Sequence, residues 1–273
     1  MGLPFVKMHG LGNDFVVVDE RGGERADWPE LAPRIAHRRF GVGCDQVLLL
    51  RSSATADLRM DIYNADGSRA EMCGNGVRCA ALYARARGLA AGETLRVETL
   101  AGIVVTRFRG GDVEVDMGEP ILDGPRIPVD AAGPVRDRDL PVGSSSVAVT
   151  CVSMGNPHAV VFVDDAEAYP VAEVGPLLEV HPFFPRRTNA EFVQVLAPDR
   201  LRMRVWERGA AVTLACGTGA CAAAVAAAWT GRAGRDVTVV LDGGELRVRW
   251  DEPTNRVFLT GPAVEVFTGE LGL

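Results

Sequence analysis

The sequence predicts an α+β fold built from two pseudo-symmetric halves, each a curved β-sheet or barrel around a central α-helix. The first observation is a cysteine-bearing segment that occurs twice, as YNADGSRAEMCGNG at 63–76 and as WERGAAVTLACGTG at 206–219. The second is an Ala-rich run after each segment, which is typical of a buried helix. The third is a set of short apolar or alternating stretches around each run, which predicts β-strands.

The repeat extends over most of the chain at one offset, the 143 residues that separate Cys73 from Cys216. The pairs at this offset include Asn13 and Asn156, Gln46 and Asn189, Asn64 and Glu207, and the glycines 88 and 231. So many matches in one order indicate two homologous halves. We expect an N-terminal half at 1–118 carrying Cys73, with 264–273 pairing back onto it, and a C-terminal half at 119–263 carrying Cys216.

The individual elements follow from hydrophobic periodicity and turn residues. In the first half we expect a turn and apolar strand within 5–20, a helix at 29–40, strands at 46–50 and 58–62, a helix at 75–87 ended by Gly88, and a β-meander at 95–100, 102–108 and 112–117. In the second half, 220–229 is apolar on every side, which predicts a helix buried all round. The stretch 126–146 has no strong period, and 264–267 predicts a strand.

Composition narrows the class of protein. With 273 residues and 47% hydrophobic residues the chain can bury one or two cores, and a net charge of −7 argues against nucleic acid or an anionic membrane as a partner. No apolar run approaches the roughly 20 residues of a spanning helix, and residues 1–10 lack the apolar core of a signal peptide. We therefore expect a cytoplasmic protein with six free thiols. Lys7 is the single lysine and lies in no context suited to pyridoxal phosphate, so Schiff-base chemistry with this cofactor is not expected.

The two cysteine loops combine two chemical properties. The first N–H groups of a helix have no internal partner and carry a partial positive charge, so they can bind a carboxylate. A cysteine at the same place is expected to have a lowered pKa and more thiolate. Each loop therefore offers a thiol together with an anion site, provided by Cys73 in the first half and Cys216 in the second.

Two matched thiols suit a reaction that inverts a carbon next to a carboxylate. One thiolate removes the α-proton from one face, and the opposite thiol donates a proton to the other face. The negative charge of the intermediate is stabilised by the helix N-termini. A racemase or epimerase needs both half-sites, because the reaction runs in both directions.

Polar residues near the loops could complete such a site. His158 is interpreted as a partner for one thiol, because Cys–His pairing increases the thiolate fraction. Glu207 occupies the position equivalent to Asn64 and is interpreted as a site carboxylate, with Arg208 as a clamp for a second carboxylate. The amides at repeat-related positions would provide a neutral hydrogen-bonding lining: Asn13, Gln46, Asn64, Asn156 and Asn189.

Other interpretations remain open at this point. Either loop taken alone favours a structural cysteine, and Cys44, Cys79, Cys151 and Cys221 are interpreted as core residues. A zinc site is disfavoured by ligand gaps of five and four residues, and a phosphate loop by the absence of its Gly-Lys-Ser/Thr ending. A proline, hydroxyproline or glutamate racemase, a cysteine hydrolase and a zinc-binding interaction module are the alternatives.

The chain resembles the diaminopimelate epimerase family in HGLGNDF (9–15), GVGCDQ (41–46), YNADGSRAEMCGNGVRC (63–79), GNPHAVVFVDD (155–165), TNAEFV (188–193) and WERGAAVTLACGTGAC (206–221). The resemblance implies cofactor-independent interconversion of LL- and meso-diaminopimelate in lysine and peptidoglycan precursor synthesis, by a chain with no metal that forms homodimers. It implies that Cys73 and Cys216 are catalytic, assisted by His158 and Glu207 respectively. It further implies that substrate is held by Asn13, Gln46, Asn64, Asn156, Asn189 and Arg208, and by the backbone of Gly74, Asn75, Gly217 and Thr218.

Overall fold

The computed structural model describes residues 2–23, 27–143 and 145–272. The chain divides into two compact units. Unit 1 contains Met1–Asp116 together with Thr260–Leu273, and unit 2 contains Met117–Leu259. Within the described residues, none of the helices has the length and apolar character that crossing a membrane requires.

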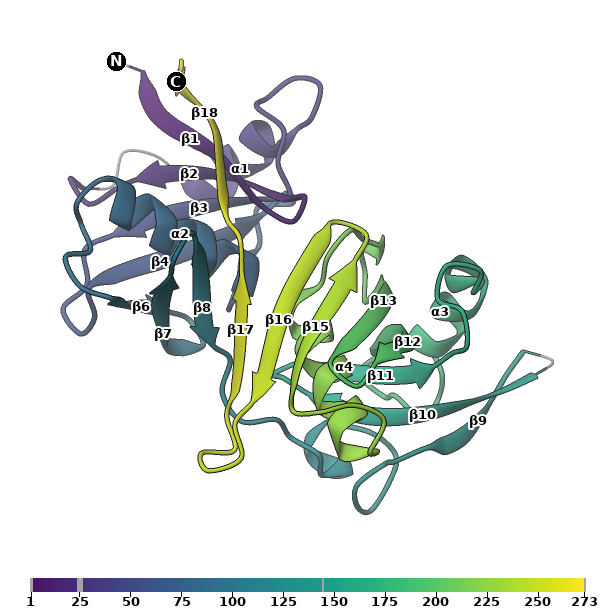
Figure 1. Ribbon diagram of the computed structural model, residues 1–273. Coiled ribbons are helices and arrows are strands. Elements are labelled where there is room, and N and C mark those ends of the chain that lie inside the picture. The colour runs from purple at the N-terminus through teal and green to yellow at the C-terminus, as the bar shows by residue number, and fades with distance from the viewer. Residues whose placement is uncertain (1, 24–26, 144, 273) are drawn as a thin grey trace. The chain divides into compact units, whose positions relative to one another are not determined.

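Unit 1 is a curved sheet whose strands follow the order β18-β1-β2-β3-β4-β6-β7-β8 (Figure 1). The pairs β2–β3 and β4–β6 are parallel, and the others in this order are antiparallel. The elements are β1 (Leu3–Gly10), β2 (Asn13–Asp19), α1 (Trp28–Ala36), β3 (Gln46–Arg51), β4 (Leu58–Asn64), β5 (Arg69–Ala70), α2 (Gly74–Ala86), β6 (Thr94–Thr99), β7 (Gly102–Arg109), β8 (Asp112–Asp116) and β18 (Val264–Leu271).

Unit 2 repeats this arrangement in the order β9-β10-β11-β12-β13-β15-β16. Its outer strand β9 precedes β10 in the chain, whereas the outer strand of unit 1 is the C-terminal β18. The elements are η1 (Gly124–Arg126), β9 (Arg138–Val142), β10 (Ser145–Ser153), β11 (Pro157–Phe162), α3 (Val171–Glu179), β12 (Asn189–Ala197), β13 (Arg200–Glu207), β14 (Ala211–Val212), α4 (Gly217–Trp229), β15 (Asp236–Leu241), β16 (Gly244–Trp250) and β17 (Val257–Gly261), which ends in unit 1.

The helices and the central strand pair of the two units match at the offset found in the sequence. The bounds of α1 and α3, and those of α2 and α4, differ by 143 residues at both ends. The central parallel pair has the same register in both units, since Phe15 lies opposite Gln46 and His158 lies opposite Asn189. The predicted α+β fold with two pseudo-symmetric halves is therefore confirmed.

Each sheet curves around one helix. The second of these helices, α4, packs against β10, β11, β12, β13, β15 and β16, and its alanines are buried on every side. Both helices end at a glycine with positive φ, Gly88 at 69° and Gly231 at 73°, which only glycine adopts without strain. The prediction of two buried helices stopped by these glycines is confirmed, although each begins earlier than expected, at Gly74 and Gly217.

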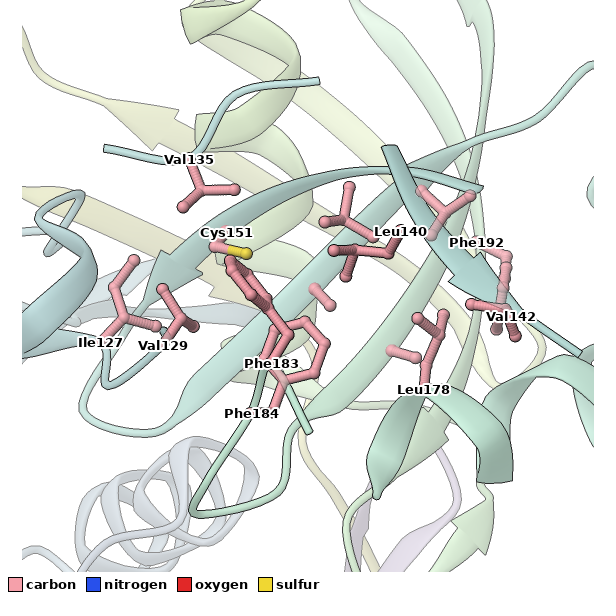
Figure 2. Close-up of a cluster of buried hydrophobic side chains, with 14 of the residues drawn as sticks. Ile127, Val129, Val135, Leu140, Val142, Cys151, Leu178, Phe183, Phe184 and Phe192 are labelled. Atoms are coloured by element: carbon pink, nitrogen blue, oxygen red, sulfur yellow. The ribbon is translucent and has the colours of Figure 1, made fainter. Parts of the chain in front are cut away.

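The opposite face of each sheet carries a second apolar layer. In unit 2 this layer joins alternate residues of β9, β10, β11 and β12 to α3 and the turn after it (Figure 2). Phe183 and Phe184 pack edge to face at the centre of this cluster. Because successive side chains of a strand point to opposite faces, the residues that alternate with this layer point toward α4.

Two sequence expectations are wrong in detail. The helix expected at 29–40 ends at Ala36, because His37 is extended and its Nδ1 atom accepts hydrogen bonds from the backbone N–H groups of Arg39 and Phe40. The stretch 126–146 has no strong period, yet it contains β9, because pairing with β10 forms the strand despite the weak pattern. The helix α3 was not predicted, and it is visible in the sequence only as the repeat partner of α1.

Candidate functional site

Both repeated cysteines are the N-cap residues of their helices. The Cys73 Sγ atom accepts a hydrogen bond from the backbone N–H of Gly76 at 3.4 Å, and Cys216 Sγ accepts one from Gly219 at 3.3 Å. Each loop therefore presents a sulfur atom beside the unpaired N–H groups of a helix N-terminus.

The Cys73 thiol has an amide neighbour within unit 1. Its Sγ atom lies 3.7 Å from Oδ1 of Asn13, and the same oxygen accepts a hydrogen bond from Nδ2 of Asn75 at 3.2 Å. Asn13 is held in turn by Asp45, which accepts from its Nδ2 atom at 2.8 Å. Three predicted site residues thus meet at the start of α2.

The Cys216 thiol lies in a more enclosed and more acidic environment. Its Sγ atom is 3.6 Å from Thr218 Oγ1, and it also hydrogen-bonds the Glu207 carboxyl. Burial raises the pKa of Cys216 well above the ordinary 9.0, and the negative charges of Glu207 and Glu191 raise it further. The expected lowering of this pKa at the helix N-terminus is therefore wrong, because desolvation outweighs the hydrogen bonds from Thr218 and Gly219.

Glu207 is a partly buried carboxyl group at the end of β13. The Thr213 hydroxyl donates a hydrogen bond to Glu207 Oε1. Burial raises the pKa of Glu207 above 4.5, against the lowering effect of the hydrogen bonds from Thr213 and Cys216. A raised pKa brings a carboxyl group closer to the range in which it can exchange a proton with a thiol.

His158 is enclosed in unit 2 between two polar side chains. Its Nδ1 atom lies 2.7 Å from Glu191 Oε1, and its Nε2 atom lies 3.0 Å from Asn156 Oδ1. The Asn156 Nδ2 atom donates to Thr218 Oγ1 at 3.3 Å. His158, Asn156 and Thr218 therefore form a connected group that reaches the Cys216 thiol.

The remaining predicted residues lie at the same ends of the central strands. Gln46 Nε2 donates to Asn64 Oδ1 at 2.8 Å in unit 1. In unit 2, Asn189 Oδ1 accepts from the backbone N–H of Arg208 at 3.0 Å, and the Arg208 guanidinium donates to the backbone carbonyl of Arg186. The two amides of unit 1 therefore contact each other, and in unit 2 Asn189 holds the backbone of Arg208.

Lys7, the single lysine, is held by polar contacts within unit 1. The Lys7 ammonium is paired with Asp14 at 2.5 Å and also donates to the carbonyl of Gly43. Over 2–23, 27–143 and 145–272, no group of three or more His, Cys, Asp or Glu side chains is arranged to hold a metal ion.

Comparison with known proteins identifies the family. The diaminopimelate epimerase family model matches residues 5–122 and 150–266. The diaminopimelate epimerase of Moorella thermoacetica is 56% identical over 276 residues, covering 98% of this chain and 99% of the relative. That of Heliobacterium modesticaldum is 53% identical over 281 residues, covering 99% of this chain and all of the relative. The chain belongs to the diaminopimelate epimerase family.

Solved structures with low sequence identity share the fold. A Bacillus anthracis protein of the PhzF phenazine biosynthesis family superposes with a TM-score of 0.74 at 18% identity, covering all of both chains. A hydroxyproline epimerase from Agrobacterium vitis gives 0.71 at 17% identity, covering all of this chain and 93% of the other. At such identities the likeness concerns the fold alone, and it agrees with the predicted architecture.

Sequence reasoning missed two residues that the structure brings to this diaminopimelate epimerase family site. Thr213 holds Glu207, and Glu191 holds His158. The signal for Glu191 was present in the TNAEFV segment, because a carboxylate in an otherwise apolar strand is unusual unless it has a partner. Nothing in the sequence around Thr213 distinguishes it from an ordinary loop threonine.

Proposed function

We propose that this chain interconverts LL- and meso-diaminopimelate, using Cys73 and Cys216 as the two acid–base groups and no cofactor. Membership of the diaminopimelate epimerase family supports the substrate. The observation that carries the mechanism is the duplicated N-cap cysteine, found once in each unit at repeat-equivalent positions. A single-base reaction would have no use for a second capped thiol.

The proposed proton transfers balance in both directions. One cysteine, as thiolate, takes the α-proton and becomes a thiol. The electron pair left on the α-carbon is delocalised into the adjacent carboxylate, where helix N–H groups stabilise the added charge. The other cysteine donates its proton to the opposite face and becomes a thiolate. In the reverse direction the two cysteines exchange roles.

The groups around Cys216 fit the role of proton donor in the resting protein. Its raised pKa keeps the thiol protonated, and in the reverse direction the neighbouring Glu207 carboxylate can take that proton so that Cys216 acts as the thiolate base. We propose that His158 provides the corresponding assistance to Cys73. We also propose that the substrate is bound by Asn13, Gln46, Asn64, Asn156, Asn189 and Arg208, with the backbone of Gly74, Asn75, Gly217 and Thr218 at its carboxylate.

The test is exchange of the α-proton in heavy water. LL-diaminopimelate incubated with the enzyme should yield the meso isomer carrying deuterium at the inverted carbon, as measured by NMR. C73A and C216A should each abolish epimerisation, because the two thiols act as one unit. The matched control is C221A, a buried cysteine one turn into α4, which should retain turnover.

Two outcomes would reject the proposal. Formation of meso product without deuterium would exclude proton exchange at the carbon. Faster turnover of proline than of diaminopimelate would instead favour a proline racemase.

We further propose a homodimer, the assembly usual in the family, which light scattering after gel filtration would detect. A cytoplasmic location is proposed because the six cysteines of the chain are all unpaired and reactive thiols persist in a reducing compartment.

A further inference from the structure

The strand residues that pack against the first turn of α2 in unit 1 differ in chemistry from those that pack against the first turn of α4 in unit 2. In unit 1 the strand residues facing the first turn of α2 are Phe15 and Leu48, both fully buried and apolar. At the repeat-equivalent positions unit 2 carries His158 and Glu191, also fully buried. The register of the strands is the same, since Val17 lies opposite Leu48 and Val160 opposite Glu191.

The apolar pair in unit 1 shows what packing requires at these two positions. The unit 1 pair demonstrates that the fold needs only apolar volume beneath the helix. A buried polar pair in the same place is costly to desolvate and contributes little stability compared with apolar residues. The His158–Glu191 pair is therefore present for a reason other than packing.

Glu191 lies directly under the N-terminus of α4. A Cβ atom added to Gly219 would be 2.8 Å from Glu191 Oε1, whereas one added to Gly76 would meet a methyl group of Leu48 at 3.2 Å. The helix terminus carries a partial positive charge that favours a carboxylate beneath it. Gly219 thus permits an approach that any larger residue would obstruct.

The carboxylate makes one hydrogen bond, and it is to the imidazole. Glu191 Oε1 lies 2.7 Å from His158 Nδ1, while no described side chain or backbone group hydrogen-bonds Oε2. A carboxylate at Nδ1 fixes the direction of the ring and keeps the proton on that nitrogen. The other ring nitrogen faces Oδ1 of Asn156 at 3.0 Å, and this oxygen accepts a hydrogen bond from Nε2 whenever that nitrogen carries a proton.

We propose that Glu191 is a positioning residue that holds His158 by its Nδ1 atom and thereby sets the direction and protonation of Nε2 for the reaction. The inference rests on the proposed function, in which His158 assists a catalytic thiol. Glu191 itself acts through the imidazole. It also acts on Cys216, because the Glu191–His158–Asn156–Thr218 contacts continue to that thiol.

Three other ionisable groups influence this pair and must be considered in any pH study. Glu207 at the end of β13 is acted on by the charges of both Glu191 and His158. Cys216, at the start of α4, is acted on by Glu191. On β10, burial raises the pKa of Cys151, and Glu191 adds to this effect.

The first experiment compares E191L, which copies the leucine of unit 1, with E191Q, which keeps an oxygen acceptor but not the charge. We expect E191L to lower kcat roughly 100-fold with KM little changed, within the range of general acid–base contributions. E191Q should recover a substantial part of this loss.

The matched control is C151A on the neighbouring strand β10, whose side chain lies on the opposite face of the same sheet. It should cost stability while leaving kcat unchanged. Equal kcat values for E191L and the wild type would overturn the inference, and so would an E191Q variant that is no more active than E191L.

A second measurement does not depend on turnover. In protein labelled with ¹⁵N at its four histidines, the His158 signal, identified by its loss in H158N, should report a proton on Nδ1. E191L should shift the tautomer balance. An unshifted signal overturns the inference even if the wild type epimerises normally, whereas a shifted signal in an inactive wild type would reject only the proposed function.

Discussion

Replacing the buried polar pair of unit 2 by its apolar counterpart from unit 1 should increase stability while abolishing activity. The double variant H158F/E191L reproduces Phe15 and Leu48, which occupy the same register and are equally buried. Replacement of a buried ion pair by apolar residues of similar volume is neutral or stabilising by about 1–4 kcal/mol.

The single variants should behave in the opposite way. H158F leaves the Glu191 carboxylate buried without its hydrogen-bond partner, which should cost about 3–5 kcal/mol. E191L leaves the Nδ1 group of a buried imidazole unpaired, which should cost about 1–3 kcal/mol. If the two substitutions acted independently, the double variant would lose the sum of the two unfolding free energies. The expected gain in stability of the double variant therefore implies strong coupling between positions 158 and 191.

Urea denaturation followed by tryptophan fluorescence can measure these differences. Three of the four tryptophans, at positions 206, 229 and 250, belong to unit 2 and report on the unit that carries the substitutions. Diaminopimelate turnover of the same samples measures the accompanying loss of activity. A double variant that is less stable than either single variant would refute the reasoning, because it would mean that the polar pair is required for packing.

Three further predictions concern the cysteine loops. All six cysteines lie within the described residues, and Cys73 alone is not buried. Iodoacetamide at about pH 8 should therefore label Cys73 first. Detection by mass spectrometry of another cysteine that is modified earlier would contradict this prediction. G219A should lower the free energy of unfolding by about 1–3 kcal/mol, because the new methyl group meets the Glu191 carboxylate. G76A should be near neutral, because the methyl group of Leu48 that it meets can move aside. Equal losses of stability for the two variants in urea denaturation would contradict this prediction. Because burial raises the pKa of Glu207, the folded protein binds its proton more tightly than the unfolded chain, and the stability from this group is full below pH 4.5 and declines as pH rises through the raised value. E207Q should therefore be as stable as the wild type near pH 4 and more stable near pH 7 in urea denaturation, and a gap that narrows with rising pH would contradict this.

The sequence by itself determined the elements that repeat. The repeat offset of 143 residues, the two cysteines before glycine-rich helix starts and the apolar helix at 220–229 can all be read from the sequence. Together they were sufficient to predict the α+β fold and two thiols at helix N-termini. The early end of α1 and the existence of β9 were not predictable in this way, because a histidine side chain and a partner strand decided them.

Tertiary structure decided the electrostatics of the cysteine loops. A helix N-terminus alone would lower the pKa of Cys216, but burial beside two carboxyl groups raises it, and burial is a property of the packed unit. In the same way, Glu191 and His158 are 33 residues apart in the chain and become partners only because β11 and β12 lie parallel in one register. The local sequence determines which ionisable groups a loop contains. Their pKa values and hydrogen-bond partners depend on burial and on the residues that the fold packs against them.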